Sequence, residues 1–147
     1  MDFPAESAKK LIIKPGAVYY TTIESISLES HYFICINETP LEDKIILLMC
    51  STSQVERARK RIEKREQPAS TFVEISKIEY KDFKVDSAVD CNTCVDYSVD
   101  KIIEKFRAKS LELKEDISSE ILNKLRKGFK DSPNHPDSIK RIVFPNL

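Results

Sequence analysis

One short segment constrains the centre of this fold more than any other part of the sequence. Residues 44–53 are Lys-Ile-Ile-Leu-Leu-Met-Cys-Ser-Thr-Ser, an apolar run that ends in three consecutive hydroxyl residues. The run is short, bounded and rich in branched side chains, which is typical of a buried strand in the middle of a sheet. We therefore predict a central strand over residues 45–52 whose end brings hydroxyl groups to the surface.

A densely basic segment follows this strand. Residues 54–66 contain no Gly and no Pro, which favours a helix, and Val55 and Ile62 give it one narrow apolar stripe. Three carboxylates in this segment face six cations, which are Arg57, Arg59, Lys60, Arg61, Lys64 and Arg65. Hydroxyl groups beside a block of positive charge are typical of a protein that handles phosphate esters, RNA above all. The alternative is a solvated helix whose charges pair along its own surface.

Composition limits the class of protein. The chain has 147 residues, of which 41% are hydrophobic and 33% charged, and this fits one soluble globular domain. The formal net charge is zero, so affinity for nucleic acid would require a local patch. No stretch approaches the roughly 18 apolar residues of a membrane span, and the acidic, broken residues 1–6 do not fit a signal peptide. We expect a cytoplasmic protein that does not associate with membranes.

The four cysteines include one C-x-x-C pair, Cys91 and Cys94. A redox pair of this kind normally lies at the start of a helix, whereas we interpret residues 87–95 as a strand. The sequence has no second C-x-x-C pair and no histidine at ligand spacing. We therefore predict no metal site, no redox site and no cofactor. Cys35 and Cys50 lie inside apolar runs and fit small core residues.

Short strands and two helices account for most of the remaining chain. Strands are predicted over residues 17–23, 31–37, 71–75 and 87–95, with a loop at 24–30 and a short returning strand at 111–113. Ser98 and Ser118 are predicted N-caps of two amphipathic helices, and Gly128 and Pro133 bracket the end of the second. The apolar residues of the tail, 137–147, predict that it packs against the domain. These elements predict a mainly β fold with flanking helices, in which a small antiparallel sheet curls into a partly open barrel.

Several short motifs follow one another in a recognisable order. They are Pro15-Gly16-Ala17-Val18-Tyr19, the strand at 31–37, the strand at 45–53, Thr71-Phe72-Val73-Glu74-Ile75 and Asp86-Ser87-Ala88-Val89. In order and spacing they resemble the PemK/MazF-like toxin endoribonucleases of bacterial toxin–antitoxin systems, with their patterns G-x-V-Y/W, R-P-V-V-I-I, V-I-V-x-P-I-T-S, T-H-V-E-I and D-S-V-I. The resemblance covers residues 14–130 of a single domain, 1–147, and leaves 131–147 as a C-terminal tail. It implies an SH3-like, partly open β-barrel, a homodimer and a cognate antitoxin as partner.

The resemblance also implies which residues act. In the family, a Thr at the end of the third strand and an Arg at the start of the second cleave single-stranded RNA without metal, by attack of the RNA's own 2′-OH. The Thr corresponds to Thr52, with Ser53 beside it, whereas the Arg position holds His31. His31, Thr52 and Ser53 are thus candidate catalytic residues, and the six cations of the basic segment are candidate RNA-binding residues.

The His31 departure leaves two functions open. Arg is a permanently charged, forked donor that suits the phosphorane. Histidine titrates near neutral pH and can act as an acid or base, or bind phosphate. A half-exposed structural residue at a strand edge explains His31 equally well. The two hypotheses are a metal-independent toxin-like endoribonuclease and a non-catalytic module on the same barrel that binds nucleic acid or protein.

Overall fold

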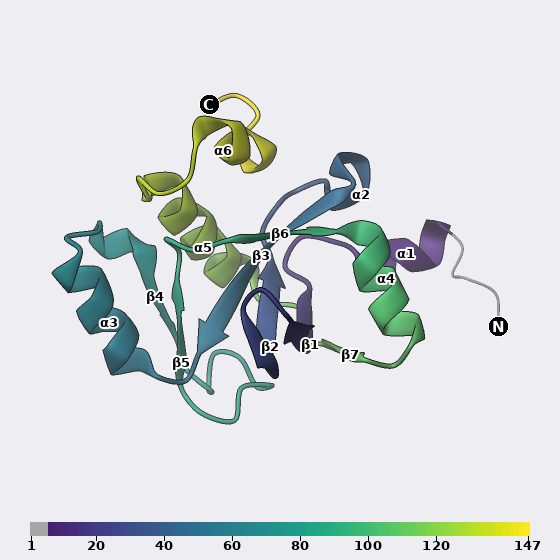
Figure 1. Cartoon of the computed structure of the whole chain (residues 1–147), viewed down its shortest axis with the longest axis horizontal. Coiled ribbons are helices and arrows are strands. Elements are labelled where there is room, and N and C mark those ends of the chain that lie inside the picture. Colours follow the sequence, from purple (N-terminus) through teal and green to yellow (C-terminus); the bar gives the residue numbers. More distant parts are fainter. Residues whose placement is uncertain (1–5) are drawn as a thin grey trace.

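The computed structural model describes residues 6–147, and its centre is an antiparallel sheet of seven strands (Figure 1). The strands are β1 (Val18–Ile23), β2 (Ser27–Cys35), β3 (Ile45–Thr52), β4 (Phe72–Ile75), β5 (Ser87–Asp90), β6 (Val95–Ser98) and β7 (Leu111–Lys114). Their spatial order is β4-β5-β3-β2-β1-β7, and β6 also pairs with β3. Because β4 and β7 remain edges, the sheet stays open. This confirms the predicted mainly β fold with flanking helices.

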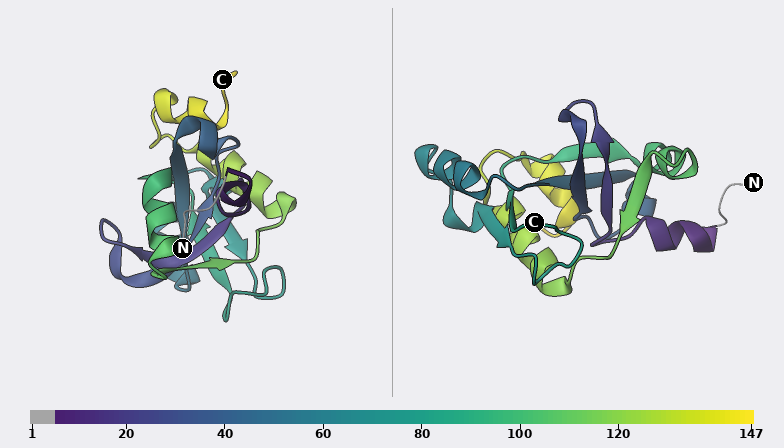
Figure 2. Two further views of the ribbon diagram at one scale, coloured as in Figure 1. Left: turned by 90° about the vertical axis from the view of Figure 1, so that its right-hand side faces the viewer. Right: turned by 90° about the horizontal axis from the view of Figure 1, so that it is seen from below.

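Helices cover both faces of the sheet (Figures 1 and 2). The helices α5 (Ser119–Asp131) and α6 (Asp137–Val143) pack on one face, and α1 (Glu6–Ile12) and α4 (Val99–Arg107) pack on the other. The basic helix α3 (Val55–Lys64) contacts β4 and β5, the short α2 (Pro40–Asp43) precedes β3, and the 3-10 turn η1 (Ala69–Thr71) leads into β4. Among the helices of residues 6–147, none is long and apolar enough to cross a membrane.

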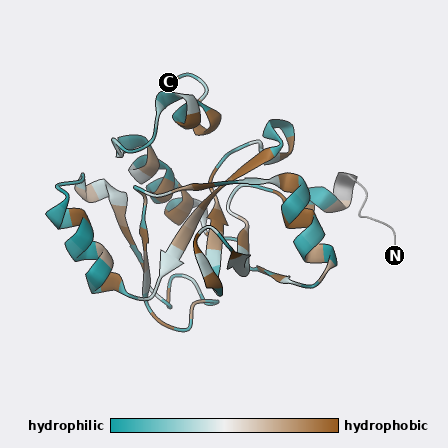
Figure 3. Cartoon of the chain, in the orientation of Figure 1, coloured by the Kyte–Doolittle hydropathy of each residue, from teal (hydrophilic) through white to brown (hydrophobic). Residues whose placement is uncertain are grey.

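The central strand β3 divides the apolar interior into two clusters. Leu47 and Met49 belong to the cluster under α5, whereas Ile46 and Leu48 belong to the cluster under α4. Successive side chains of a strand point to opposite faces, so a strand that is covered on both faces needs an unbroken apolar sequence. Figure 3 shows this continuous hydrophobic colouring along β3 and the hydrophilic surface of α3. The predicted bounds of the central strand, residues 45–52, are confirmed.

Both predicted N-caps are confirmed. Ser98 Oγ accepts a hydrogen bond from the backbone N–H of Lys101 at 3.0 Å, and Ser118 Oγ accepts one from the backbone N–H of Ile121 at 3.2 Å. Each serine satisfies a backbone donor that the first turn of a helix leaves unpaired. The tail also packs as predicted, because Val143 is buried in the cluster that includes α5.

Some predicted boundaries are wrong. Strand β2 begins at Ser27, inside the segment predicted as a loop, because its first residues are mostly exposed and carry no apolar alternation. Helix α5 continues through Gly128 to Asp131, so this glycine does not mark its end. Residues 6–12, interpreted as part of a polar lead, form α1, and Ile12 is buried there.

The single strand predicted over residues 87–95 is also wrong, because the chain divides into β5 and β6 at the C-x-x-C pair. Val89 of β5 lies opposite Ser51, and Val95 of β6 lies opposite Leu48. Continuing the register of β5 would place residue 92 opposite Leu48, so three extra residues are inserted between the two strands. Insertions of this kind bend a strand. The insertion lets one stretch of chain pair with β3 at two separate places.

The cysteine pair lies at this insertion, outside both strands. Cys91 is buried and Cys94 is half-buried, and neither forms a disulfide. Burial raises the pKa of both thiols, that of Cys94 to about 12, so they stay protonated at neutral pH. A protonated, buried thiol is a poor nucleophile and a poor metal ligand, so these cysteines have the character of core residues.

Candidate functional site

The pairing of β2 with β3 brings two of the predicted catalytic residues together, His31 in the middle of β2 and Thr52 at the end of β3. Phe33 pairs with Cys50 and Ile34 pairs with Met49. Continued beyond the paired residues, this register places His31 opposite Thr52, on the face of the sheet that carries Phe33 and Cys50. His31 itself pairs with Thr21 of β1 and is half-exposed.

A cavity of about 510 Å³ is lined by residues of β2, of the end of β3 and of α3, and we name it the α3 cavity. Its lining includes His31, Thr52, Arg57, Arg61 and Asp90. Two predicted catalytic residues and two predicted RNA-binding residues therefore share one hollow. They come from three separate elements, β2, β3 and α3, and only the folded sheet brings them together.

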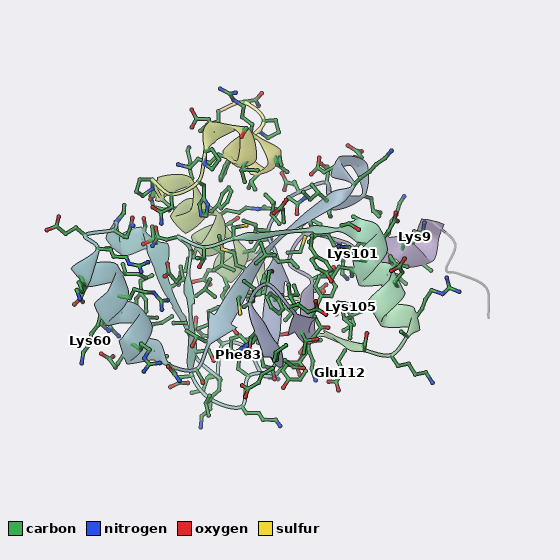
Figure 4. All side chains as sticks on the ribbon, in the orientation of Figure 1. Lys9, Lys60, Phe83, Lys101, Lys105 and Glu112 are labelled. Carbon is green, nitrogen blue, oxygen red and sulfur yellow. The ribbon has the colours of Figure 1, made fainter. Side chains whose placement is uncertain are left out.

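A second cavity, of about 440 Å³, is lined by the same part of β2 and by Ser51 of β3. We name it the tyrosine cavity after Tyr20 and Tyr32, whose ring centroids are 4.8 Å apart. Ser53 lines this cavity and not the α3 cavity, so Thr52 and Ser53 face different hollows. Figure 4 labels Phe83 and Glu112, which also line it.

The two cavities meet at His31 and Ser51, which line both. The candidate site is thus a continuous surface around the middle of β2 and the end of β3. The tyrosine pair was not predicted as part of it. The alternation of β1 could have revealed Tyr20, because Tyr19 before it is fully buried and Tyr20 must face the other side of the strand.

The hydroxyl group of Thr52 has a defined orientation. Its Oγ1 accepts a hydrogen bond from the backbone N–H of Gln54 at 3.1 Å, where the chain turns from β3 into α3. This contact uses the oxygen as an acceptor and leaves the O–H as a donor. Cys50 lines the same cavity, but burial raises the pKa of its thiol to about 11, so it contributes no charge there.

The six cations of the basic segment do not share one surface. Arg57 and Arg61 line the α3 cavity, and Arg65 lines a smaller hollow next to it together with Arg61. Lys60 and Lys64 are exposed on α3 and line neither the α3 cavity nor the tyrosine cavity; Figure 4 labels Lys60.

Arg59 belongs to a different surface. It forms ion pairs with Glu56 and with Glu74 of β4, and its guanidinium lies over the ring of Phe72 at 4.8 Å from the centroid. The hollow that it lines also contains Lys124 and Lys127 of α5 and does not include His31. Arg59 was included among the candidate RNA-binding residues because it belongs to the same basic segment.

Asp90 is a residue of the α3 cavity that sequence reasoning missed. It ends β5, at a point where the sequence predicts that the strand continues, and it forms an ion pair with Arg61 at 3.0 Å.

Within residues 6–147, no group of three or more His, Cys, Asp and Glu side chains is arranged to hold a metal ion. The α3 cavity offers an imidazole, a hydroxyl and two guanidinium groups, a set that can bind phosphate and transfer protons.

Neither a protein-family model nor a curated protein sequence matches this chain. Comparison of structures does find similar proteins. A mycobacterial endoribonuclease, solved in complex with its cognate antitoxin, superimposes with a TM-score of 0.52 and 9% sequence identity, over 84% of this chain and 97% of that chain.

Two other solved structures align with a TM-score of 0.49 and 9% identity. They are the Mycobacterium tuberculosis toxin MazF-mt6, over 77% of this chain and 91% of that chain, and the MazE–MazF complex from Deinococcus radiodurans, over 80% and 91%. An identity this low carries information on the fold and not on the activity. The chain has the fold of the mycobacterial endoribonuclease, a mainly β fold with flanking helices, as the order of its sequence motifs implied.

Proposed function

We propose that this protein is a toxin-like, metal-independent endoribonuclease that cleaves single-stranded RNA in the α3 cavity. The observation that carries the proposal is that His31 and Thr52 share this cavity with Arg57 and Arg61. A titratable group, a hydroxyl donor and permanent cations within one hollow are what phosphoryl chemistry needs.

In the proposed reaction the 2′-oxygen attacks the adjacent phosphorus and the bond from phosphorus to the 5′-oxygen breaks. The 2′-OH gives up its proton to a base, the 5′-oxygen receives one from an acid, and the products are a 2′,3′-cyclic phosphate and a 5′-OH. Neutral His31 can accept the first proton, and charged His31 can supply the second or contact the phosphate. Thr52 donates its O–H to a non-bridging oxygen. Ser53, in the tyrosine cavity, donates its O–H to a phosphate oxygen of the neighbouring nucleotide.

Donors held about 2.7–3.1 Å from the developing charge contribute about 3 kcal/mol of transition-state stabilisation each. We assign binding of the RNA backbone to six cations, which are Arg57, Arg59, Lys60, Arg61, Lys64 and Arg65. The arginines that line the cavities contact phosphates directly. The two exposed lysines of α3 attract the strand at longer range, and Arg59 contributes least, because Glu56 and Glu74 already neutralise it.

The same resemblance supports a homodimer, a cognate antitoxin as partner and a cytoplasmic location. The similar mycobacterial endoribonuclease was solved with its cognate antitoxin. Light scattering of the purified protein tests the homodimer. A monomer at high concentration would reject the homodimer and leave the fold assignment unchanged. A small neighbouring gene for an acidic protein that binds this chain would support the antitoxin.

The test of cleavage uses purified protein and single-stranded RNA in EDTA. We expect products that end in a 2′,3′-cyclic phosphate, and we expect His31→Ala and Thr52→Ala to abolish them. Asn123→Ala, an exposed position on α5 away from both cavities, is the matched control and should cleave like the wild type. RNA that stays intact at several pH values would reject the enzyme.

The second candidate is a non-catalytic module that binds RNA or protein through the same surface. His31 stands where the family has an Arg, so the permanent charge at that position is missing. This difference favours a non-catalytic module. RNA binding without cleavage would select this function. The affinity should then fall steeply with salt, with a slope of about −0.7 for each phosphate contact to a single strand.

A further inference from the structure

Asp90 is a nearly buried carboxylate whose two oxygens are both occupied by donors. Its side chain is 9% exposed. Oδ1 accepts from the backbone N–H of Asn92 at 3.0 Å and from Asn92 Nδ2 at 2.9 Å. Oδ2 accepts from Arg61 Nε at 3.2 Å and from the second guanidinium nitrogen, Nη2, at 3.0 Å. Four donors hold the carboxylate in one orientation.

Asn92, which donates to Asp90, is itself held in place by other buried polar groups. The side-chain amide of Asn92 donates to Thr71 Oγ1 at 2.9 Å, and its oxygen accepts from Ser132 Oγ at 2.7 Å. Thr71, Asn92 and Ser132 are all buried. They come from η1, from the insertion between β5 and β6, and from the end of α5. Three segments that are remote in sequence therefore determine where Asp90 lies.

This arrangement gives Arg61 a fixed position in the α3 cavity. The guanidinium group carries five N–H donors in a rigid plane, and Asp90 engages only its Nε and Nη2 nitrogens. The side chain is 40% exposed, and it lines the cavity that also contains His31 and Thr52. Pairing with Asp90 lowers the net charge of the pair, but it orients the remaining donors before any ligand arrives.

We propose that Arg61 supplies the guanidinium that the position of His31 lacks, and that Asp90 is its positioning residue. Arg61 contacts the non-bridging oxygens of the scissile phosphate and transfers no proton, while His31 keeps the acid–base role. The proposal rests on the proposed cleavage, and it separates Arg61 from the other cations of α3, which only hold the strand.

Two measurements on the full chain test the assignment. The first is cleavage of single-stranded RNA at saturating and at limiting substrate. Removing one preorganised donor to a developing charge typically costs ~100–1,000-fold in kcat. We expect Arg61→Ala to fall in that range, and Arg61→Lys to recover only a small part, because it keeps the charge and loses the fork. Added guanidinium ion should partly restore cleavage by Arg61→Ala.

The second measurement is binding of a 2′-deoxy oligonucleotide, which cannot be cleaved. We expect Arg61→Ala to weaken this binding about 10-fold and to reduce the salt slope by about 0.7. Asp90→Asn should lower kcat ~10-fold or more while thermal unfolding shows a folded protein and the salt slope stays near the wild-type value. Lys10→Ala, which removes an exposed cation of α1 away from both cavities, is the matched control and should change neither measurement.

The two measurements distinguish the outcomes. Cleavage by Arg61→Ala within about threefold of the wild type would overturn the assignment and leave the endoribonuclease intact. Intact RNA with the wild type, combined with weakened binding by Arg61→Ala, would reject cleavage and keep Arg61 as a phosphate contact. Unchanged binding by Arg61→Ala would refute the phosphate contact whether or not RNA is cleaved.

Discussion

A glycine in the interior of α5 occupies a place where a methyl group has no space. An ideal Cβ on Gly128 would lie 2.6 Å from the carbonyl oxygen of Ser70, 2.7 Å from Cys91 Sγ and 2.9 Å from Cys91 Cβ. Real Cβ atoms essentially never approach other heavy atoms within 3.0 Å. A rotation of the Cys91 side chain can relieve only the Sγ contact, so α5 or η1 has to move.

We expect Gly128→Ala to lower the free energy of unfolding by about 2 kcal/mol. In an unhindered helix interior, Ala is more favourable than Gly by about 1 kcal/mol. An extra methyl group in a well-packed core costs about 1–3 kcal/mol, and contact with a backbone oxygen places Gly128 at the upper end. The difference corresponds to a decrease in Tm of about 4–8 °C for a chain of this length.

Urea unfolding followed by far-UV circular dichroism measures this effect. Adding Cys91→Ala to Gly128→Ala should recover only part of the loss, because the contact with Ser70 remains. Asn123→Ala, exposed on the same helix, is the control and should change stability by a few tenths of a kcal/mol at most. If Gly128→Ala unfolds at the same or a higher urea concentration than the wild type, with an unchanged m value, the packing argument is refuted.

Three further measurements test other parts of the structure. Replacing the fully buried Asn37 with Ala should destabilise the protein by about 2–4 kcal/mol in urea unfolding, because the N–H of Leu47 and the carbonyl of Ile45 lose their partner; a loss below about 1 kcal/mol would contradict this. The cleavage rate or the RNA affinity should depend more on pH in the wild type than in His31→Arg, because arginine stays charged throughout; identical profiles for the two proteins would make His31 structural. Burial lowers the pKa of His135 below its ordinary value of 6.5, so the unfolded chain binds more protons and stability falls as the pH drops below that value. Thermal unfolding between about pH 7 and 5 should show a smaller pH dependence for His135→Gln, and equal slopes would count against this assignment.

The central strand and the two capped helices could be predicted from the sequence because their signals are local. An apolar run covered on both faces and a serine before an amphipathic stripe need no information from distant residues. The proximity of His31 and Thr52 also follows once β2 and β3 are paired in register, since each residue lies two positions beyond the pair of Phe33 with Cys50.

The rest of the candidate site depends on contacts between remote segments. The position of Asp90 depends on an insertion between β5 and β6, which carries no pattern of its own in the sequence. The separation of Arg59 from Arg57 and Arg61 depends on Glu74 and Phe72 of β4, about one helix length further along the chain. Helical spacing can show which cations share a side of α3, and it cannot show which side faces His31 and Thr52.

The segment 91–94, which contains the three extra residues between β5 and β6, also limits which changes in chain length the sheet can accept. Val89 faces the cluster under α5, whereas Val95 and Tyr97 pack against the cluster under α4, although all three are odd-numbered. Side chains alternate between the two faces of a strand, so an odd number of extra residues turns the odd-numbered side chains from one face of the sheet to the other. Removing two residues from the insertion would preserve this exchange and leave a single-residue bulge, whereas removing one or three would turn Val95 and Tyr97 toward the wrong side. In the natural variation of this protein, length changes at this point should therefore occur in pairs.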